Sequence, residues 1–140
     1  MVTRAQIVAE AESWKGTPHV WQASRKGRGC DCKGLIAGVA RELDLPESRS
    51  VYALMHSYGK VDVRLLRRGM AVVFDQTDQM EPGNVLLLKM LGHPQHLAIL
   101  GHGEIIHTYA KGPECVVGAH LEPALRLWPL DSIWAWRGVG

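Results

Sequence analysis

The stretch Gly29-Cys30-Asp31-Cys32-Lys33-Gly34-Leu35-Ile36 is a glycine-rich loop that passes directly into a helical pattern. The charged, glycine-rich segment before it predicts a loop, and the apolar residues from position 35 recur at helical spacing as far as position 43. Cys32 therefore falls in the first turn of a predicted helix, where unpaired backbone N–H groups favour negative charge. We expect this position to shift the Cys32 thiol toward the thiolate, which is the form that attacks carbonyl groups. The alternative is that Cys32 is a small buried apolar residue.

Composition predicts one folded domain that spans residues 1–140. The chain has 46% hydrophobic and 21% charged residues, which is typical of a globular protein. Its net charge of +2 is too small to indicate nucleic acid as a partner. Basic residues cluster at 25–33 and 64–68, and we expect both clusters to be solvated surface.

Nothing in the sequence predicts a membrane span or a secretion signal. The longest apolar runs, such as Val85–Leu88, are far shorter than the roughly 20 residues that a span needs. The N-terminus lacks the apolar core and cleavage site of a signal peptide, so we expect synthesis in the cytoplasm without export by that route. Three cysteines are an odd number, which is typical of a reducing compartment.

The order of elements predicts an α+β fold. Apolar periodicity indicates helices over 4–14, capped by Thr3, and 32–43, with shorter helices over 52–58 and 62–68. A Pro-Gly turn at 82–83 then introduces five predicted strands, over 84–90, 96–101, 104–109, 115–119 and 132–137. Their spacing suits an antiparallel meander of about five strands, on which the Cys32 helix packs.

Two of the seven histidines fall on neighbouring predicted strands. His96 opens one strand and His107 lies toward the end of the next, and Gly101-His102-Gly103 forms the turn between them. A cysteine nucleophile needs a base and a third group that orients the base, both from separate parts of the chain. Cys32, His96 and His107 satisfy this requirement. The alternative is that each histidine is a structural residue of a strand.

A zinc site is the main alternative chemistry. The spacing argues against it, because Cys30 and Cys32 are closer together than the usual ligand pair, and His93-Pro94-Gln95-His96 lacks the glutamate and helix of a metalloprotease motif. We therefore expect no metal and no cofactor. The candidate ligands are Cys30, Cys32, His93, His96, His102, His107, Cys115 and His120.

Several ordered motifs carry a resemblance to a known family. They are Gly16-Thr17-Pro18-His19, Trp21-Gln22-Ala23, Asp31-Cys32-Lys33-Gly34-Leu35, His96-Leu97-Ala98-Ile99 and Ile106-His107. With this order and spacing the sequence resembles the NlpC-type papain-like cysteine peptidases of bacterial cell walls. The resemblance covers nearly the whole chain and implies the papain-like NlpC fold, with N-terminal helices and the nucleophile helix packed on an antiparallel sheet.

Carried over position by position, the resemblance implies a Cys-His-His triad. Cys32 is then the nucleophile, His96 the general base and afterwards the acid, and His107 the residue that orients His96. The backbone N–H of Cys32 would be one oxyanion donor. Asp31 resembles the acid of the family's substrate pocket, and a helix N-cap is the compatible alternative for it.

Departures from the family pattern concern the expected peptide groove. His19 stands where the family has Tyr, Gln22-Ala23 replaces a double glycine, and Lys33 replaces Ser. We expect His19, Trp21, Asp31 and Lys33 to contact substrate. Cys30 stands where the family has an apolar residue and is expected to be buried, or else to form a second, oxidation-sensitive thiol.

The short segment 92–96 and the sequence 22–24 most resemble the phage-tail subgroup, which includes peptidases of tailed phages and gene transfer agents. The resemblance implies a peptidoglycan hydrolase that cuts the bond between γ-D-glutamate and the diamino acid of the stem peptide. It also implies a place at the tail tip of a virion or phage-like particle, with tail-tip or baseplate hub proteins as partners. The alternatives are an N-acetylmuramoyl-L-alanine amidase and a tail-tip structural component with weak or no activity.

Overall fold

The computed structural model describes residues 1–45 and 62–140, so the helix predicted over 52–58 lies outside the described residues. The helices are α1 (Arg4–Ser13), α2 (Cys32–Glu42), α4 (Val63–Val73) and α5 (Leu121–Leu127). The strands are β1 (Ser24–Arg25), β2 (Gly29–Cys30), β3 (Phe74–Thr77), β4 (Val85–Met90), β5 (His93–Leu100), β6 (Glu104–His107), β7 (Val117–His120) and β8 (Leu130–Trp136).

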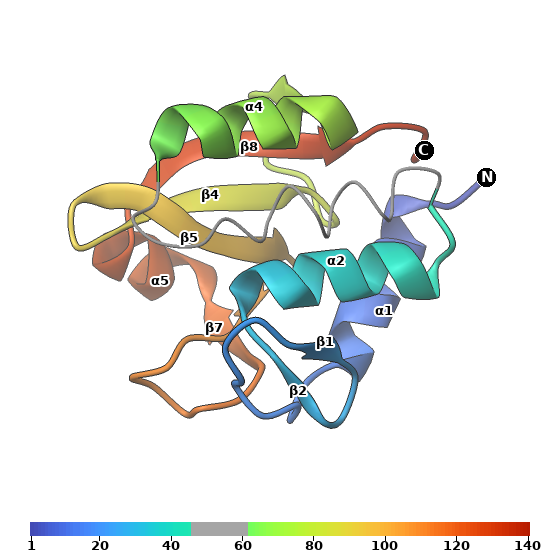
Figure 1. Cartoon of the computed structure of the whole chain (residues 1–140). Helices are drawn as coiled ribbons and strands as arrows, with labels where there is room; N and C mark the ends of the chain where they lie inside the picture. Colours follow the sequence, from blue (N-terminus) through green and yellow to red (C-terminus); the bar gives the residue numbers. More distant parts are fainter. Residues whose placement is uncertain (46–61) are drawn as a thin grey trace.

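The main sheet is antiparallel and contains six strands in the order β3-β8-β4-β5-β6-β7, one strand more than the sequence predicted. The four strands from β4 to β7 form the predicted meander. β8 departs from it, because the chain returns across the sheet to pair with both β4 and β3 (Figure 1). The α+β fold class is confirmed, while β3, α5 and the β1–β2 hairpin were not predicted.

Local signals explain where the helices begin and end. Thr3 caps α1, as predicted. Its hydroxyl accepts a hydrogen bond from the Gln6 backbone N–H, and the Gln6 side chain accepts one from the Thr3 backbone N–H, which is a capping box. Asp62 caps α4, but the predicted end at residue 68 is wrong, because α4 continues to Val73. The reason is packing: the residues Leu66, Met70 and Val73 continue the helical period and are all buried.

The main sheet, seen between the helices in Figure 1, separates two apolar layers, which is why the first four residues of β4, 85–88, are all apolar and buried. Alternate β4 side chains enter the layer under α1, α2 and α4, and the others enter the layer under α5. In the first layer Leu35, Ile36 and Val39 of α2 are fully buried beside Leu97 of β5. This packing places the first turn of α2 next to β5, as the predicted helix-on-sheet arrangement requires.

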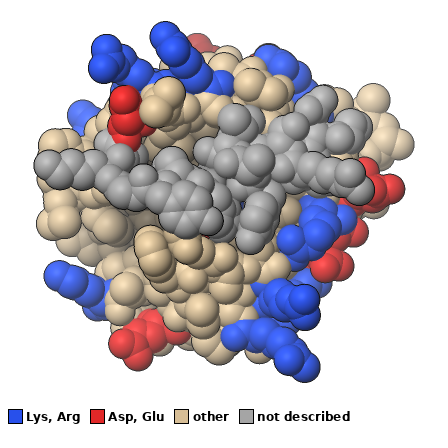
Figure 2. Space-filling model, in the orientation of Figure 1, with Lys and Arg blue, Asp and Glu red and all other residues tan. Residues whose placement is uncertain are grey.

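Charged side chains of both signs share the surface. On the face drawn in Figure 2, Lys and Arg side chains are spread around the edge with Asp and Glu beside several of them. Arg67 of the 64–68 cluster pairs with Asp131 at 2.7 Å, and Lys26 of the 25–33 cluster pairs with Glu10. Within residues 1–45 and 62–140, no helix has the length and apolar character that crossing a membrane requires.

Candidate active site

Asp31 holds the loop before α2 against the first turn of that helix. Its Oδ1 accepts a hydrogen bond from the Gly34 N–H at 2.7 Å, and its Oδ2 accepts one from the Gln22 N–H at 2.8 Å. The N-cap alternative for Asp31 is therefore confirmed. A Cβ at Gly34 would collide with the backbone carbonyl oxygen of Ala23, so only glycine permits this close approach of loop and helix. Together these contacts position Cys32 in the first turn.

The two strand histidines meet as their hairpin predicts. β5 and β6 pair Ile99 with Ile106, so His96 and His107 fall on the same face of the sheet. His96 Nε2 lies 2.9 Å from His107 Nδ1, which is hydrogen-bonding distance. The two residues are only 3% and 1% exposed.

Two aromatic rings enclose the histidine pair. Tyr109 stacks on His107 with a centroid distance of 5.6 Å and an interplanar angle of 15°. Trp128, directly after α5, lies 4.9 Å from the His107 ring and 5.5 Å from the His96 ring. These contacts hold both imidazoles in place and exclude water from them. Neither ring was predicted from the sequence: Tyr109 lies only two residues after His107, whereas no local signal connects Trp128 to the histidines.

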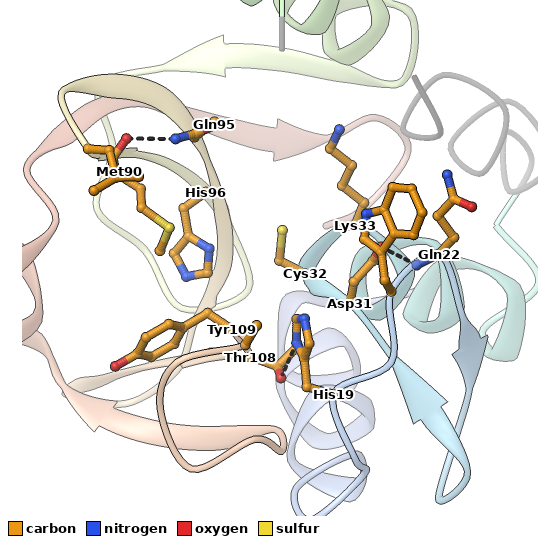
Figure 3. A pocket seen from close by; sticks show the side chains of 13 residues that line it. His19, Gln22, Asp31, Cys32, Lys33, Met90, Gln95, His96, Thr108 and Tyr109 are labelled. Carbon is orange, nitrogen blue, oxygen red and sulfur yellow. Dashed lines mark hydrogen bonds between the residues drawn. The ribbon is translucent and has the colours of Figure 1, made fainter. Parts of the chain in front are cut away.

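A cavity of about 370 Å³ opens beside this pair and brings Cys32 and His96 together. In Figure 3 Cys32 and His96 lie on facing sides of the cavity, with Asp31 and Lys33 on the Cys32 side. His107 is not among the lining residues, because it lies behind His96. The lining consists of His19, Trp21, Gln22, Asp31, Cys32, Lys33, Met90, Leu91, Gln95, His96, Thr108, Tyr109 and Ala110.

All four residues expected to contact substrate line this cavity. His19 is held by a hydrogen bond between its Nδ1 and the Thr108 hydroxyl at 2.9 Å (Figure 3). Trp21 is 72% exposed, and Lys33 and Asp31 are half-buried. The rest of the lining was not predicted from the sequence. It comes from the β4–β5 hairpin and from the residues after β6, and it consists of Met90, Leu91, Gln95, Thr108, Tyr109 and Ala110.

Burial keeps both histidines of the pair neutral near pH 7. It lowers the pKa of His96 to about 3, with further lowering from the positive charges that His107 and His19 can carry. Burial alone lowers the pKa of His107 to about 4. Since His96 Nε2 is engaged with His107, the ring nitrogen of His96 that is left for another partner is Nδ1.

The expected shift of Cys32 toward the thiolate is wrong. Burial raises the pKa of the Cys32 thiol, and the negative charge of Asp31 raises it further. Backbone hydrogen bonds from Leu97 and Lys33 and the positive charge of Lys33 lower this pKa, but they do not outweigh burial. The site therefore holds a neutral thiol beside a neutral imidazole, and the thiol needs a base to remove its proton.

The other cysteines and histidines within residues 1–45 and 62–140 do not line this cavity, His19 excepted. Cys30 is fully buried, as expected, and burial raises its pKa to about 12. Cys115 is half-buried, and its backbone forms an isolated antiparallel β-bridge with Pro18. Among residues 1–45 and 62–140, no three Cys, His, Asp or Glu side chains form a group that could hold a metal ion. His93, His102 and His120 are exposed.

Comparisons with known proteins identify the fold. No protein-family model and no curated protein match the sequence. Among solved structures, the NlpC/p60 domain of the peptidoglycan hydrolase SagA aligns with a TM-score of 0.61 and 28% identity over 94% of this chain and 97% of that domain. NlpC2 from Trichomonas vaginalis aligns with a TM-score of 0.68 and 15% identity over 97% of this chain and 47% of that protein. The chain therefore has the mixed α+β fold of NlpC/p60 domains, and its structural neighbours include the NlpC/p60 domain of a peptidoglycan hydrolase.

Proposed function

We propose that this chain is a peptidoglycan hydrolase of the cysteine peptidase type, in which Cys32, His96 and His107 hydrolyse an amide bond of the stem peptide. The observation that carries this proposal is that Cys32 and His96 line one cavity while His96 is hydrogen-bonded to the buried His107. The similarity to the NlpC/p60 domain of a peptidoglycan hydrolase supports the substrate class.

In the first half of the reaction, the neutral His96 accepts the Cys32 proton on Nδ1 while Sγ attacks the carbonyl carbon of the scissile amide. This attack converts the carbonyl oxygen to an oxyanion, and the backbone N–H of Cys32 is a suitable donor because it has no partner inside the helix. His96 then gives the proton to the leaving nitrogen. The C–N bond breaks and leaves a thioester on Cys32.

In the second half, His96 removes a proton from a water molecule, which attacks the thioester carbonyl. The C–S bond breaks, the peptide leaves as a carboxylic acid, and His96 returns its proton to Sγ. In this proposal His107 orients His96 for both proton transfers. When the Nε2–H of His96 donates to His107 Nδ1, the other ring nitrogen of His96, Nδ1, is unprotonated and can act as the base.

Within this proposal, His19, Trp21 and Lys33 contact the bound peptide from the cavity wall. Asp31 contributes mainly by shaping the cavity, because both of its carboxylate oxygens already accept backbone N–H groups. The proposal includes one peptidase domain over residues 1–140, which is supported by a main sheet that draws strands from residues 74 to 136.

We propose the bond between γ-D-glutamate and the diamino acid as the one cleaved. The test is to incubate the purified protein with purified stem-peptide fragments and to identify the products by mass spectrometry. Two new peptides that meet at this bond are expected from the wild type and none from Cys32→Ala. Release of intact stem peptide from muropeptides would instead identify an amidase. No product from any fragment or from whole peptidoglycan would favour a structural component.

The proposal extends to a place at the tail tip of a virion or phage-like particle, among hub or baseplate proteins. Its support is the resemblance of segments 22–24 and 92–96 to the phage-tail subgroup. Immunogold electron microscopy of particles purified from the organism that carries this chain tests it. Label at the end of the tail is expected, and particles without label at the tail would contradict this location.

A further inference from the structure

The hairpin between β4 and β5 has an unusual residue at its tip. Met90 pairs with His93, so the turn consists only of Leu91 and Gly92, whose φ angles are 54° and 80°. Positive φ at both positions defines the type I′ turn, which favours Asn, Asp or Gly. A leucine at the first position is disfavoured, because its Cβ crowds the backbone in this region.

The strain at Leu91 is not offset by burial of its side chain in the core. The Leu91 side chain is 87% exposed, so it contributes little to either apolar layer. The hairpin is held by other groups, including the hydrogen bond from Gln95 Nε2 to the Met90 carbonyl oxygen at 2.7 Å (Figure 3). A polar residue such as asparagine would suit this position of the turn better.

What distinguishes this position is that Leu91 lines the cavity that holds Cys32 and His96. Met90, next to it in the chain, lies across the cavity from Gln22 in Figure 3. The Gln22 side carries the exposed Trp21, and Gln22 itself has a positive φ of 60°. Two strained segments therefore present apolar side chains to one cavity, and strain retained at such positions points to function.

We propose that Leu91 is a specificity-determining residue, whose side chain packs on an aliphatic group of the bound peptide, such as the methyl group of an alanine residue. The proposal rests on the peptidase function proposed above and deepens it. The aliphatic group belongs to the peptide because the cavity that Leu91 lines is the one in which Cys32 and His96 lie. Packing removes apolar surface from water on both partners, and this burial stabilises the complex.

The test compares Leu91→Asn with Leu91→Met. Asparagine tolerates positive φ but is polar, whereas methionine keeps an apolar side chain of similar volume. With purified stem-peptide fragments as substrate, Leu91→Asn is expected to raise the melting temperature and to raise KM about tenfold at nearly unchanged kcat. Leu91→Met is expected to keep KM within about twofold of the wild type.

A matched control is Asp44→Asn, since Asp44 also has a positive φ of 51° but does not line the cavity. This change is expected to leave KM unchanged. If Leu91→Asn has the same KM as the wild type, the proposal is overturned. The exposed leucine would then be explained by contact with a partner protein instead. An equal rise in KM in both Leu91 variants would also overturn it, because the shape of the hairpin would then be the cause.

Calorimetric binding of the same fragments separates this proposal from the proposed function. The measurement uses Cys32→Ala and the double variant Cys32→Ala/Leu91→Asn, neither of which can form the thioester. About tenfold weaker binding by the double variant is expected, even if the wild type proves unable to hydrolyse the fragments. Equal affinity in the two variants, or no binding in either, would overturn the role of Leu91.

Discussion

His96 Nε2 lies 2.9 Å from His107 Nδ1, and both imidazoles are buried and pack against the rings of Tyr109 and Trp128. A hydrogen bond between two neutral imidazoles requires one N–H donor and one acceptor nitrogen, so the pair shares a single bridging proton. When that proton is on His96 Nε2, His96 Nδ1 is an acceptor. This arrangement of the two rings is therefore compatible with the tautomer that a general base needs.

Replacement of either histidine should reveal this division of roles. His96→Ala is expected to reduce kcat/KM by about a thousandfold or more, and Cys32→Ala is expected to be equally damaging, because the two residues act as one unit. His107→Asn is expected to cost about 10- to 100-fold, since an amide oxygen can still accept from His96 Nε2–H. Steady-state hydrolysis of stem-peptide fragments measures both. A loss in His107→Asn as large as that in His96→Ala would contradict a purely orienting role.

The two neighbouring cysteines should behave differently when each is changed to alanine. Cys32→Ala is expected to abolish hydrolysis without unfolding the protein, because Cys32 is only half-buried. Cys30→Ala is expected to keep most of the activity and to lose about 1 kcal/mol of stability, because it removes one heavy atom from the core. Product formation and urea unfolding check these outcomes. Equal loss of activity in both variants would contradict the assignment of Cys32 as the nucleophile.

Stability should fall as the pH is lowered from about 6.5 toward 4. The pKa of His96 is lowered to about 3 and that of His107 to about 4, so in this window the unfolded chain binds protons that the folded chain does not. Above about pH 6.5 this loss of stability is absent. Within the window, each histidine lowers the free energy of unfolding by up to about 1.4 kcal/mol for each pH unit that the pH falls. Urea unfolding at pH 5 and pH 7 measures it. In His107→Asn the free energy of unfolding should differ less between pH 5 and pH 7 than it does in the wild type. The same difference in both proteins would contradict the burial of a neutral His107.

Asp31→Asn should lower both the stability and the pKa of the Cys32 thiol. An asparagine can offer one acceptor oxygen, so one of the N–H groups of Gln22 and Gly34 loses its partner, at a cost of about 1–3 kcal/mol. Removal of the negative charge also removes a contribution that raises the thiol pKa. The pH dependence of iodoacetamide labelling at Cys32, followed by peptide mass spectrometry, measures this shift. An unchanged labelling profile would mean that the Asp31 charge does not act on Cys32.

Much of the layout followed from local patterns. The Thr3 cap, the start of α2 after Asp31 and the β5–β6 hairpin depend on nearby residues, so their chemistry is visible in the sequence. The extent of α4 and the position of β8 between β3 and β4 were predicted wrongly or not at all. Both depend on which distant surfaces bury one another, and pattern within a short window does not contain that information.

The sequence by itself determined the candidate residues, because Cys32 at a helix start and His96 and His107 on successive strands are positions that periodicity identifies. Only the tertiary structure decided how those residues behave. Burial reversed the expected direction of the Cys32 pKa, and the ring of Trp128 joined a histidine pair from a distant part of the chain. The wall formed by Leu91 likewise depends on the folded hairpin. Desolvation and long-range packing arise from the whole fold, whereas the identity and spacing of reactive side chains are properties of the sequence.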